Sequence, residues 1–292
     1  MSEETESSQA QNEAVQRIDV MHLGRPRVIC CHRFGDVLVD PGPTTSIEHV
    51  IESLGDIEPR AVLLTHIHLD HAGGTGALVR RFPDLEVYVH SIGAPHMVDP
   101  SRLVPSARRV FGDLLEPLWG EVIPVPEQNV RAIEDGDVVY GLTAILTPGH
   151  SGHHVCFLHE DSGVALVGDM VGQTVETESR TILSTPPPEI DLELWADSVR
   201  RVMSFAPTEL GLTHFGHAGD PERQAEMALE ELARVGERSR DGDQESVVAY
   251  LNETLDSMDE LNGPSVRQAT PPLEQLWLGL ERYWRKKMER SV

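Results

Sequence analysis

The stretch Thr65-His66-Ile67-His68-Leu69-Asp70-His71-Ala72-Gly73-Gly74 places four side chains of the metal-binding type within six residues. It directly follows residues 61–64, a continuous apolar run typical of a strand covered on both faces. In an extended segment, His66 and His68 project to the same side, while Asp70 and His71 lie where the chain turns into a helix. This spacing predicts a site for two metal ions. Imidazole and carboxylate ligands together favour zinc, with iron or manganese as alternatives.

Alternating strand and helix patterns surround this stretch and predict the α/β class. Residues 28–40 predict two short strands joined at Gly35-Asp36, and residues 46–54 predict a helix with Ser46 as its N-cap. Further strands are predicted at 87–90, 138–146, 155–158, 164–167 and 209–212.

The 292 residues divide into three predicted parts. Residues 1–16 form an acidic, polar tail that is expected to be disordered. Residues 17–221 form the catalytic domain, in which residues 95–120 interrupt the strand pattern and are a candidate lid. Residues 222–292 carry apolar side chains at helical spacing, which predicts a C-terminal helical extension that covers the core.

The composition narrows the classes of partner. Lys+Arg is 24 and Asp+Glu is 48, so the formal net charge is −24, whereas nucleic-acid binding relies on basic surfaces. The longest apolar run is far below the ~20 residues needed to cross a bilayer. The first residues are acidic, unlike a secretory signal. We therefore expect no nucleic-acid or membrane partner, a cytoplasmic location, and reduced, buried thiols at Cys30, Cys31 and Cys156.

The pattern H-x-H-x-D-H after an apolar strand resembles the signature of the metallo-β-lactamase superfamily. Three later stretches follow that family's order, at 146–154 (LTPGHSGHH), 164–169 (VALVGD) and 210–217 (LGLTHFGH). The resemblance implies a four-layer αβ/βα sandwich. It also implies His66, His68 and His150 around a first metal, Asp70, His71 and His214 around a second, and Asp169 between the two.

Several histidines near these motifs leave alternatives open. His217 competes with His214 for the last ligand position, and we prefer His214 because it directly follows a predicted strand, as His66 does. His153 and His154 are better explained as groups that support the ligands or begin a helix. His90 and His96 flank the candidate lid and are candidates for lining the cavity.

The resemblance implies a metal-dependent hydrolase with two zinc ions per chain. A metal-bridging hydroxide would attack a small ester, thioester or lactone carbonyl, as in the glyoxalase-II-like and lactonase branches. Asp70 is the predicted catalytic residue, because it would bind the second metal and orient the attacking water or accept its proton. Zinc β-lactamases place a cysteine where this chain has Asp169, so penicillin hydrolysis is not expected.

Two other functions remain as alternatives. One is an iron-dependent oxidoreductase of the sulfur dioxygenase type, and the other is a phosphodiesterase, which the net charge disfavours. The predicted partner is a small-molecule substrate. The Leu-, Trp- and Tyr-rich last helix is also compatible with packing on a second copy of the chain in a homodimer. Candidate cavity walls are an apolar rim of Met97, Phe111, Trp119 and Trp195, with Arg102, Arg108 and Arg180 as partners for a substrate carboxylate.

Overall fold

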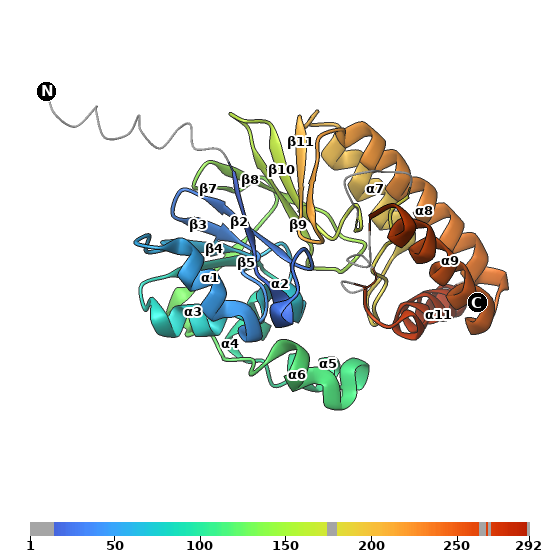
Figure 1. The fold of residues 1–292 in the computed structure, drawn as a ribbon, viewed down its shortest axis with the longest axis horizontal. Coiled ribbons are helices and arrows are strands. Elements are labelled where there is room, and N and C mark those ends of the chain that lie inside the picture. The colour runs from blue at the N-terminus through green and yellow to red at the C-terminus, as the bar shows by residue number, and fades with distance from the viewer. Residues whose placement is uncertain (1–14, 174–179, 263–266, 268–269, 291–292) are drawn as a thin grey trace, which may run out of the picture.

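Two six-stranded sheets pack face to face, with helices on both outer sides (Figure 1). The computed structural model describes residues 15–173, 180–262, 267 and 270–290. Within these residues the layers run helix, sheet, sheet, helix, so the expected four-layer αβ/βα sandwich with C-terminal helices is confirmed.

The first sheet has the strand order β1-β2-β3-β4-β5-β6. The first three strands pair antiparallel, and β3 to β6 pair parallel. Because parallel strands end at the same edge, the residues that follow β3, β4 and β5 meet there. The strands are β1 (Gln16–Asp19), β2 (Cys30–Phe34), β3 (Val37–Val39), β4 (Ala61–Leu63), β5 (Glu86–His90) and β6 (Val130–Ile133); the helices on this side include α1 (Ile47–Leu54), α2 (Leu69–Ala72), α3 (Thr75–Arg81) and α4 (Ala94–Val98).

The second sheet has the order β12-β11-β10-β9-β8-β7, and only its β10–β11 pair is parallel among the described strands. Helices from the C-terminal part of the chain cover its outer face (Figure 1). The strands are β7 (Val138–Val139), β8 (Leu142–Leu146), β9 (Val155–His159), β10 (Val164–Gly168), β11 (Glu209–Leu212) and β12 (Gly216–Ala218); the helices are α7 (Leu192–Met203), α8 (Pro221–Asp241), α9 (Gln244–Asn262) and α11 (Leu273–Arg290).

Most predicted strands are present, with differences at the edges. The run 138–146 is not one strand, because Tyr140 and Gly141 adopt φ values of 51° and 79° and turn the chain between β7 and β8. Strands β1, β6 and β12 were not predicted. β1 begins at Gln16, and residues 1–14 of the expected acidic tail lie outside the described residues. Ser46 precedes α1 as expected, but its side chain makes no capping hydrogen bond.

The candidate lid folds as short helices at one side of the first sheet. Besides α4, it contains α5 (Leu103–Phe111) and α6 (Leu115–Trp119), which stand below the sheet in Figure 1. No residue of α5 is buried, whereas Met97 and Leu115 are. The C-terminal extension reaches this segment, because Gln275 Nε2 donates a hydrogen bond of 2.7 Å to the Val110 carbonyl.

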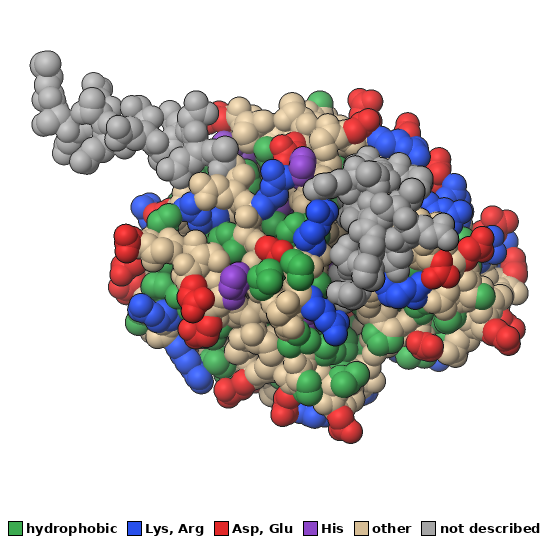
Figure 2. Space-filling view, in the orientation of Figure 1, with side chains coloured by type: hydrophobic (Ala, Val, Ile, Leu, Met, Phe, Trp, Pro, Cys, Tyr) green, Lys and Arg blue, Asp and Glu red, His purple; other side chains and the backbone are tan. Residues whose placement is uncertain are grey.

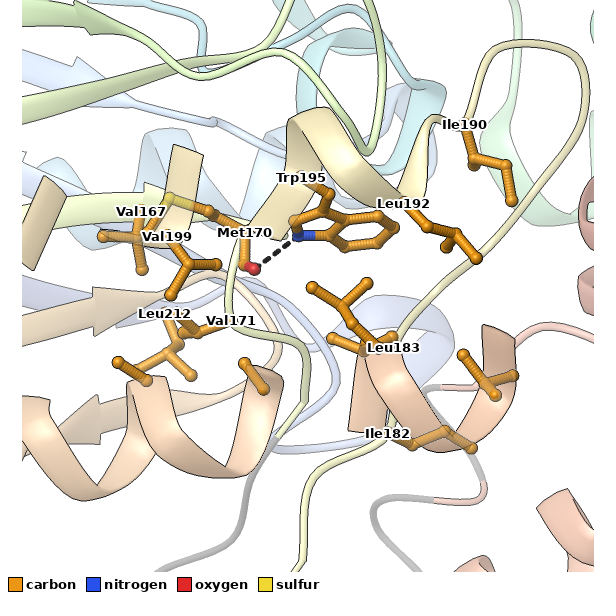
Figure 3. Close-up of a cluster of buried hydrophobic side chains, with 14 of the residues drawn as sticks. Val167, Met170, Val171, Ile182, Leu183, Ile190, Leu192, Trp195, Val199 and Leu212 are labelled. Carbon is orange, nitrogen blue, oxygen red and sulfur yellow. Dashed lines mark hydrogen bonds between the residues drawn. The ribbon is translucent and has the colours of Figure 1, made fainter. Parts of the chain in front are cut away.

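The C-terminal helices share a hydrophobic core with the second sheet. Trp195 of α7 is 1% exposed, lies among apolar side chains from both layers, and donates its indole N–H to the Met170 carbonyl at 2.6 Å (Figure 3). The same cluster includes Leu251 of α9 and Leu280 of α11. No helix of the described chain has the length and apolar content needed to span a bilayer.

One carboxyl group lies inside this lobe. Glu231 of α8 is 3% exposed, and Tyr250 of α9 donates its hydroxyl proton to Glu231 Oε2 at 2.6 Å. Burial raises the pKa of Glu231 to about 7, although Tyr250 and the nearby Arg234, Arg180 and Arg238 oppose this rise. Ionised Glu231 therefore destabilises the folded state relative to the unfolded chain.

We expect Glu231→Gln to stabilise the protein at pH 8 and to change little at pH 4. The folded state binds the Glu231 proton more tightly than the unfolded chain, so its stability falls as the pH rises from about 4.5 to about 7. The full cost is about 3 kcal/mol above that range. Thermal unfolding between pH 4 and 8 measures the difference, with exposed Glu237→Gln as the control. A gain independent of pH would contradict this assignment.

Candidate metal centre

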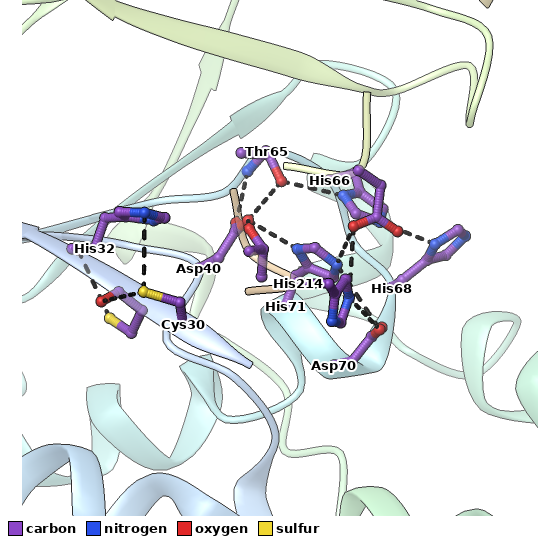
Figure 4. Close-up of polar contacts among 12 residues, drawn as sticks. Cys30, His32, Asp40, Thr65, His66, His68, Asp70, His71 and His214 are labelled. Carbon is purple, nitrogen blue, oxygen red and sulfur yellow. Dashed lines mark hydrogen bonds and ion pairs between the residues drawn. The ribbon is translucent and has the colours of Figure 1, made fainter. Parts of the chain in front are cut away.

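The seven predicted site residues meet where the two sheets face each other (Figure 4 labels five of them). Four come from the first sheet, because β4 ends directly before them and α2 begins among them. Three come from the second sheet, after β8, β10 and β11. In that order they are His66, His68, Asp70 and His71, and then His150, Asp169 and His214.

Three imidazoles form the first group. His66 Nε2 and His150 Nε2 lie 2.9 Å and 3.0 Å from His68 Nδ1. His150 Nδ1 donates to the Ser184 carbonyl at 3.0 Å, so its other nitrogen presents a lone pair to the site. The three ligand nitrogens lie within 4.8 Å of one another, close enough to hold one divalent cation together.

Asp70, His71 and His214 form the second group. Asp70 Oδ2 lies 3.3 Å from His214 Nε2 and 3.8 Å from His71 Nε2. His214 Nδ1 donates to the Val28 carbonyl at 2.9 Å, which orients its ring. Asp70 has 22% of its side chain exposed, so this carboxyl group is reachable from solvent.

Asp169 lies between the two groups and faces both. Its Oδ2 is 3.5 Å from His150 Nε2, and its Oδ1 is 3.2 Å from His71 Nε2 and 3.5 Å from His214 Nε2. The backbone N–H of Asp169 donates to His154 Nε2 at 3.4 Å. A carboxylate in this place can bridge two cations.

Asp40 connects the site to the first sheet, although the sequence analysis did not assign it a role. It is fully buried, and Oδ1 accepts the Thr65 backbone N–H at 2.9 Å. Oδ2 accepts His71 Nδ1–H at 2.8 Å and the hydroxyls of Thr65 and Thr213 at 2.7 Å and 3.0 Å (Figure 4). Because the Thr65 hydroxyl donates to Asp40, its oxygen accepts from His66 Nδ1 at 3.1 Å. Asp40 thus orients the ring of His71 directly and the ring of His66 through the Thr65 hydroxyl.

Carboxylates and imidazoles in the site stabilise each other's charged forms. Burial lowers the pKa of His66, and it lowers the pKa of His68 to about 3. Burial alone would lower the pKa of His71 and His214, but Asp169 and Asp70 raise both. Burial would also raise the pKa of Asp169, but the facing imidazoles lower it. Basic imidazoles therefore neutralise the carboxylates, which is a role that divalent cations take over when they displace those protons.

The donor set fits metal ions. His71 Nε2 and Asp169 Oδ1 are buried and make no hydrogen bond of acceptable geometry, although they lie 3.2 Å apart. Unsatisfied buried polar atoms are rare and costly in proteins. A cation between them would satisfy both atoms, and the mixture of imidazole and carboxylate suits zinc, iron or manganese.

Other predicted residues lie outside the cluster or at its margin. His217 is exposed on β12, so the structure brings His214 into the site instead. His154 contacts Thr147 Oγ1 at 2.8 Å and supports Asp169. Trp195 is a core residue whose ring lies nearly perpendicular to that of His150, with centroids 5.2 Å apart. Arg108 pairs with Glu116 at 2.9 Å on the surface.

Gly149, directly before His150, packs against α7. A Cβ atom at this position would lie 2.2 Å from Trp195 Cα, and its φ of +145° is one that side chains rarely adopt. The carbonyl of Gly149 also accepts the Asp191 backbone N–H at 2.8 Å. Because Gly149 has no side chain, the segment that carries His150 can pack directly against α7.

A family model described as the metallo-beta-lactamase superfamily matches residues 29–214, which include all seven cluster residues. The chain belongs to the metallo-β-lactamase superfamily. The match ends at His214, the last of the cluster residues in the chain, and the helices from α8 onward lie beyond it.

Several curated proteins are similar to this chain. The metallo-beta-lactamase fold-containing protein ST1585 of Sulfurisphaera tokodaii is 27% identical over 195 residues, 64% of this chain and 71% of the relative. A hydroxyacylglutathione hydrolase of Enterobacter sp. is 33% identical over 125 residues, 41% and 37% of the two chains. An atrochrysone carboxyl ACP thioesterase of Aspergillus fumigatus is 31% identical over 179 residues, 61% and 44%. The chain thus spans less than half the length of the last two.

Two solved structures share the superfamily fold with this chain. ST1585 from Sulfolobus tokodaii has a TM-score of 0.65 at 23% identity, covering 88% of this chain and 99% of that one. The metallo-beta-lactamase family protein TTHA1429 from Thermus thermophilus has a TM-score of 0.67 at 20% identity, covering 94% and 93%. Coverage this high requires that the likeness extend into the C-terminal helices.

We expect Asp40→Asn to weaken zinc binding about 10- to 100-fold. The carboxamide cannot accept hydrogen bonds with both of its polar atoms, so His71 and Thr65 lose part of their orientation. Competition with a chromophoric chelator measures the affinity. Asp56→Asn, at an exposed position after α1, is the matched control. Unchanged zinc affinity in Asp40→Asn would contradict the role given to Asp40.

Gly149→Ala is expected to destabilise the fold by about 3 kcal/mol, from overpacking against α7 and from backbone strain. Gly152→Ala is the matched control, because its Cβ would meet only Glu189 Oε2 at 3.5 Å. Urea unfolding of both variants measures the difference. Equal stability of the two variants would show that the Gly149 contact with Trp195 relaxes without cost.

Proposed function

We propose that this protein is a metal-dependent hydrolase that cleaves a small ester, thioester or lactone, with two zinc ions as its preferred complement. The observation that carries the proposal is the position of Asp169, whose two carboxylate oxygens face separate groups of ligand-type side chains. His66, His68 and His150 would hold one ion, Asp70, His71 and His214 the other, and Asp169 would contact both.

When bound, such ions lower the pKa of water and polarise a substrate carbonyl. The protein contributes the geometry: buried second partners fix the rings of His71, His150 and His214, so their nitrogens need little reorganisation. This rigidity favours a reaction in which negative charge develops on one oxygen at a fixed place.

Asp70 is the carboxylate with access to substrate. Its side chain is 22% exposed, against 4% for Asp169, and Oδ2 faces His214 Nε2 at 3.3 Å. In the proposed reaction, a water proton passes to Asp70 as the water oxygen bonds to the carbonyl carbon. The C–O or C–S bond then breaks, its electron pair leaves with the alcohol or thiol, and Asp70 returns the proton.

The substrate class rests on chemistry and on the relatives. Two of the similar proteins are named as a hydroxyacylglutathione hydrolase and an acyl carrier protein thioesterase, which supports carbonyl substrates including thioesters. The net charge of −24 disfavours phosphodiester polymers. On the face shown in Figure 2, basic side chains lie interspersed with acidic ones and form no continuous stripe.

Asp70→Asn is expected to lower kcat/KM for the best substrate by about 10²- to 10⁴-fold, because the carboxamide cannot accept a proton. The assay uses a panel of thioesters, lactones and aryl esters, with the metal content of each sample determined by elemental analysis after purification without added metal. Asp84→Asn, on an exposed turn before β5, is the matched control and should retain full activity.

About two zinc ions per chain, with turnover that is lost in Asp70→Asn, would support the proposal. A single iron ion per chain with no hydrolysis of any panel member would refute it. In that case oxygen consumption with sulfur substrates becomes the next measurement.

A further inference from the structure

His153 lies beside the first group of imidazoles without belonging to it. Its ring is 6.3 Å from that of His66 and nearly parallel to it, and 6.0 Å from that of His68 and nearly perpendicular to it. Nδ1 contacts Ser151 Oγ at 3.2 Å, whereas Nε2 has no hydrogen-bond partner among the described residues. One ring nitrogen is thus anchored and the other is available.

His90 approaches the same place from the first sheet. His90 is the last residue of β5. Tyr88 of β5 pairs with Leu63 of the parallel strand β4, so His90, two residues further along, lies opposite Thr65. Since side chains alternate along a strand, His90 projects to the same face as Tyr88, which packs between the two sheets. The segment that carries His153 meets this edge, because Val155 N–H donates to the Thr65 carbonyl at 2.7 Å.

The hydrogen bond made by His90 determines where its proton lies. The backbone N–H of Ile92 donates to His90 Nδ1 at 3.0 Å, so Nδ1 carries the lone pair and the neutral ring carries its proton on Nε2. His90 Nε2 has no hydrogen-bond partner among the residues that the structure describes. Burial lowers the pKa of His90, which favours this neutral form.

The turn after His90 packs against the H-x-H motif. A Cβ atom at Gly93 would lie 3.0 Å from Ile67 Cγ2, and Ile67 separates His66 from His68. His68 is also one of the two cluster residues that are not fully buried, the other being Asp70. His90 and His153 therefore lie beside the first group, whose His68 is partly exposed.

We propose that His90 and His153 form a substrate-binding subsite that donates hydrogen bonds to a neutral oxygen of the acyl group, such as an ether, hydroxyl or keto oxygen. The proposal rests on the proposed function, because it places that acyl group beside the first group of imidazoles. Ser151 can donate its hydroxyl proton to His153 Nδ1, which leaves the ring proton on Nε2. Neither neutral N–H group supplies the countercharge that a buried carboxylate needs, so an uncharged acceptor fits this place better.

The test compares acids that differ by one oxygen. Methoxyacetate and butyrate are nearly isosteric, as are 3-methoxypropanoate and pentanoate, and each is the acid that hydrolysis of an ester would release. Isothermal titration calorimetry of the zinc-loaded protein measures their dissociation constants. We expect the ether acid of at least one pair to bind the wild type about tenfold more tightly than its alkyl partner, as one added hydrogen bond allows.

The variants His90→Asn and His153→Asn remove the proposed Nε2–H donors and keep an acceptor for the contacts that each Nδ1 makes. Asparagine Oδ1 takes the place of Nδ1, so it can accept from Ile92 N–H or contact Ser151, but it has no atom at the position of Nε2. Each variant should reduce the tenfold preference to about threefold or less. His153→Gln places an amide nitrogen near Nε2 and should restore the preference.

His159→Asn is the matched control, because His159 Nδ1 contacts Ser162 Oγ at 2.7 Å at the far end of β9. It should leave the preference unchanged. The subsite is refuted if the wild type shows no preference in either pair, or if both Asn variants keep it; if one variant fails to fold, the other decides. Failure of the proposed function is seen separately, as an absence of ester, thioester and lactone turnover in the wild type.

Discussion

The hydrogen bonds to Asp40 are the constraint on which the site depends. One buried carboxyl group accepts bonds from Thr65 after β4, from His71 in α2 and from Thr213 after β11. Asp40 adopts a φ of +52°, a backbone conformation that costs a non-glycine residue about 1–2 kcal/mol. The three partners offset this cost by holding segments of both sheets at one point. The cluster is therefore oriented by the fold before any ion binds.

The sequence predicted the cluster well because its members are local in the chain or follow recognisable strands. His66, His68, Asp70 and His71 lie within one motif, and Asp169 and His214 each follow an apolar strand, a pattern that survives in sequence alone. The sequence placed Asp40 only at the end of the predicted strands at 28–40, because its role depends on the parallel register of β3 and β4. The free nitrogens of His90 and His153 likewise depend on contacts that no spacing encodes.

The strands that the sequence did not predict have a common physical cause. β6 is mostly exposed, with only Ile133 buried, and β12 is three residues long and includes Gly216, so neither has the apolar run of a central strand. They form because a neighbouring strand supplies hydrogen-bonding partners, as Gly211 does for His217. Such edge strands form because of their tertiary pairing. The buried strands β4 and β10 can instead be predicted from their own apolar composition.

Each group of ligand-type side chains draws on both sheets. The first combines His66 and His68 with His150, and the second combines Asp70 and His71 with His214. A cation bound to either group would therefore connect the two halves of the sandwich, and its binding free energy would add to the stability of their association. The buried residues leave little freedom for selecting a substrate. In the proposed reaction, selectivity would come from the margin, where His68 and Asp70 are partly exposed. There, His90 and His153 each have a ring nitrogen with no hydrogen-bond partner among the described residues.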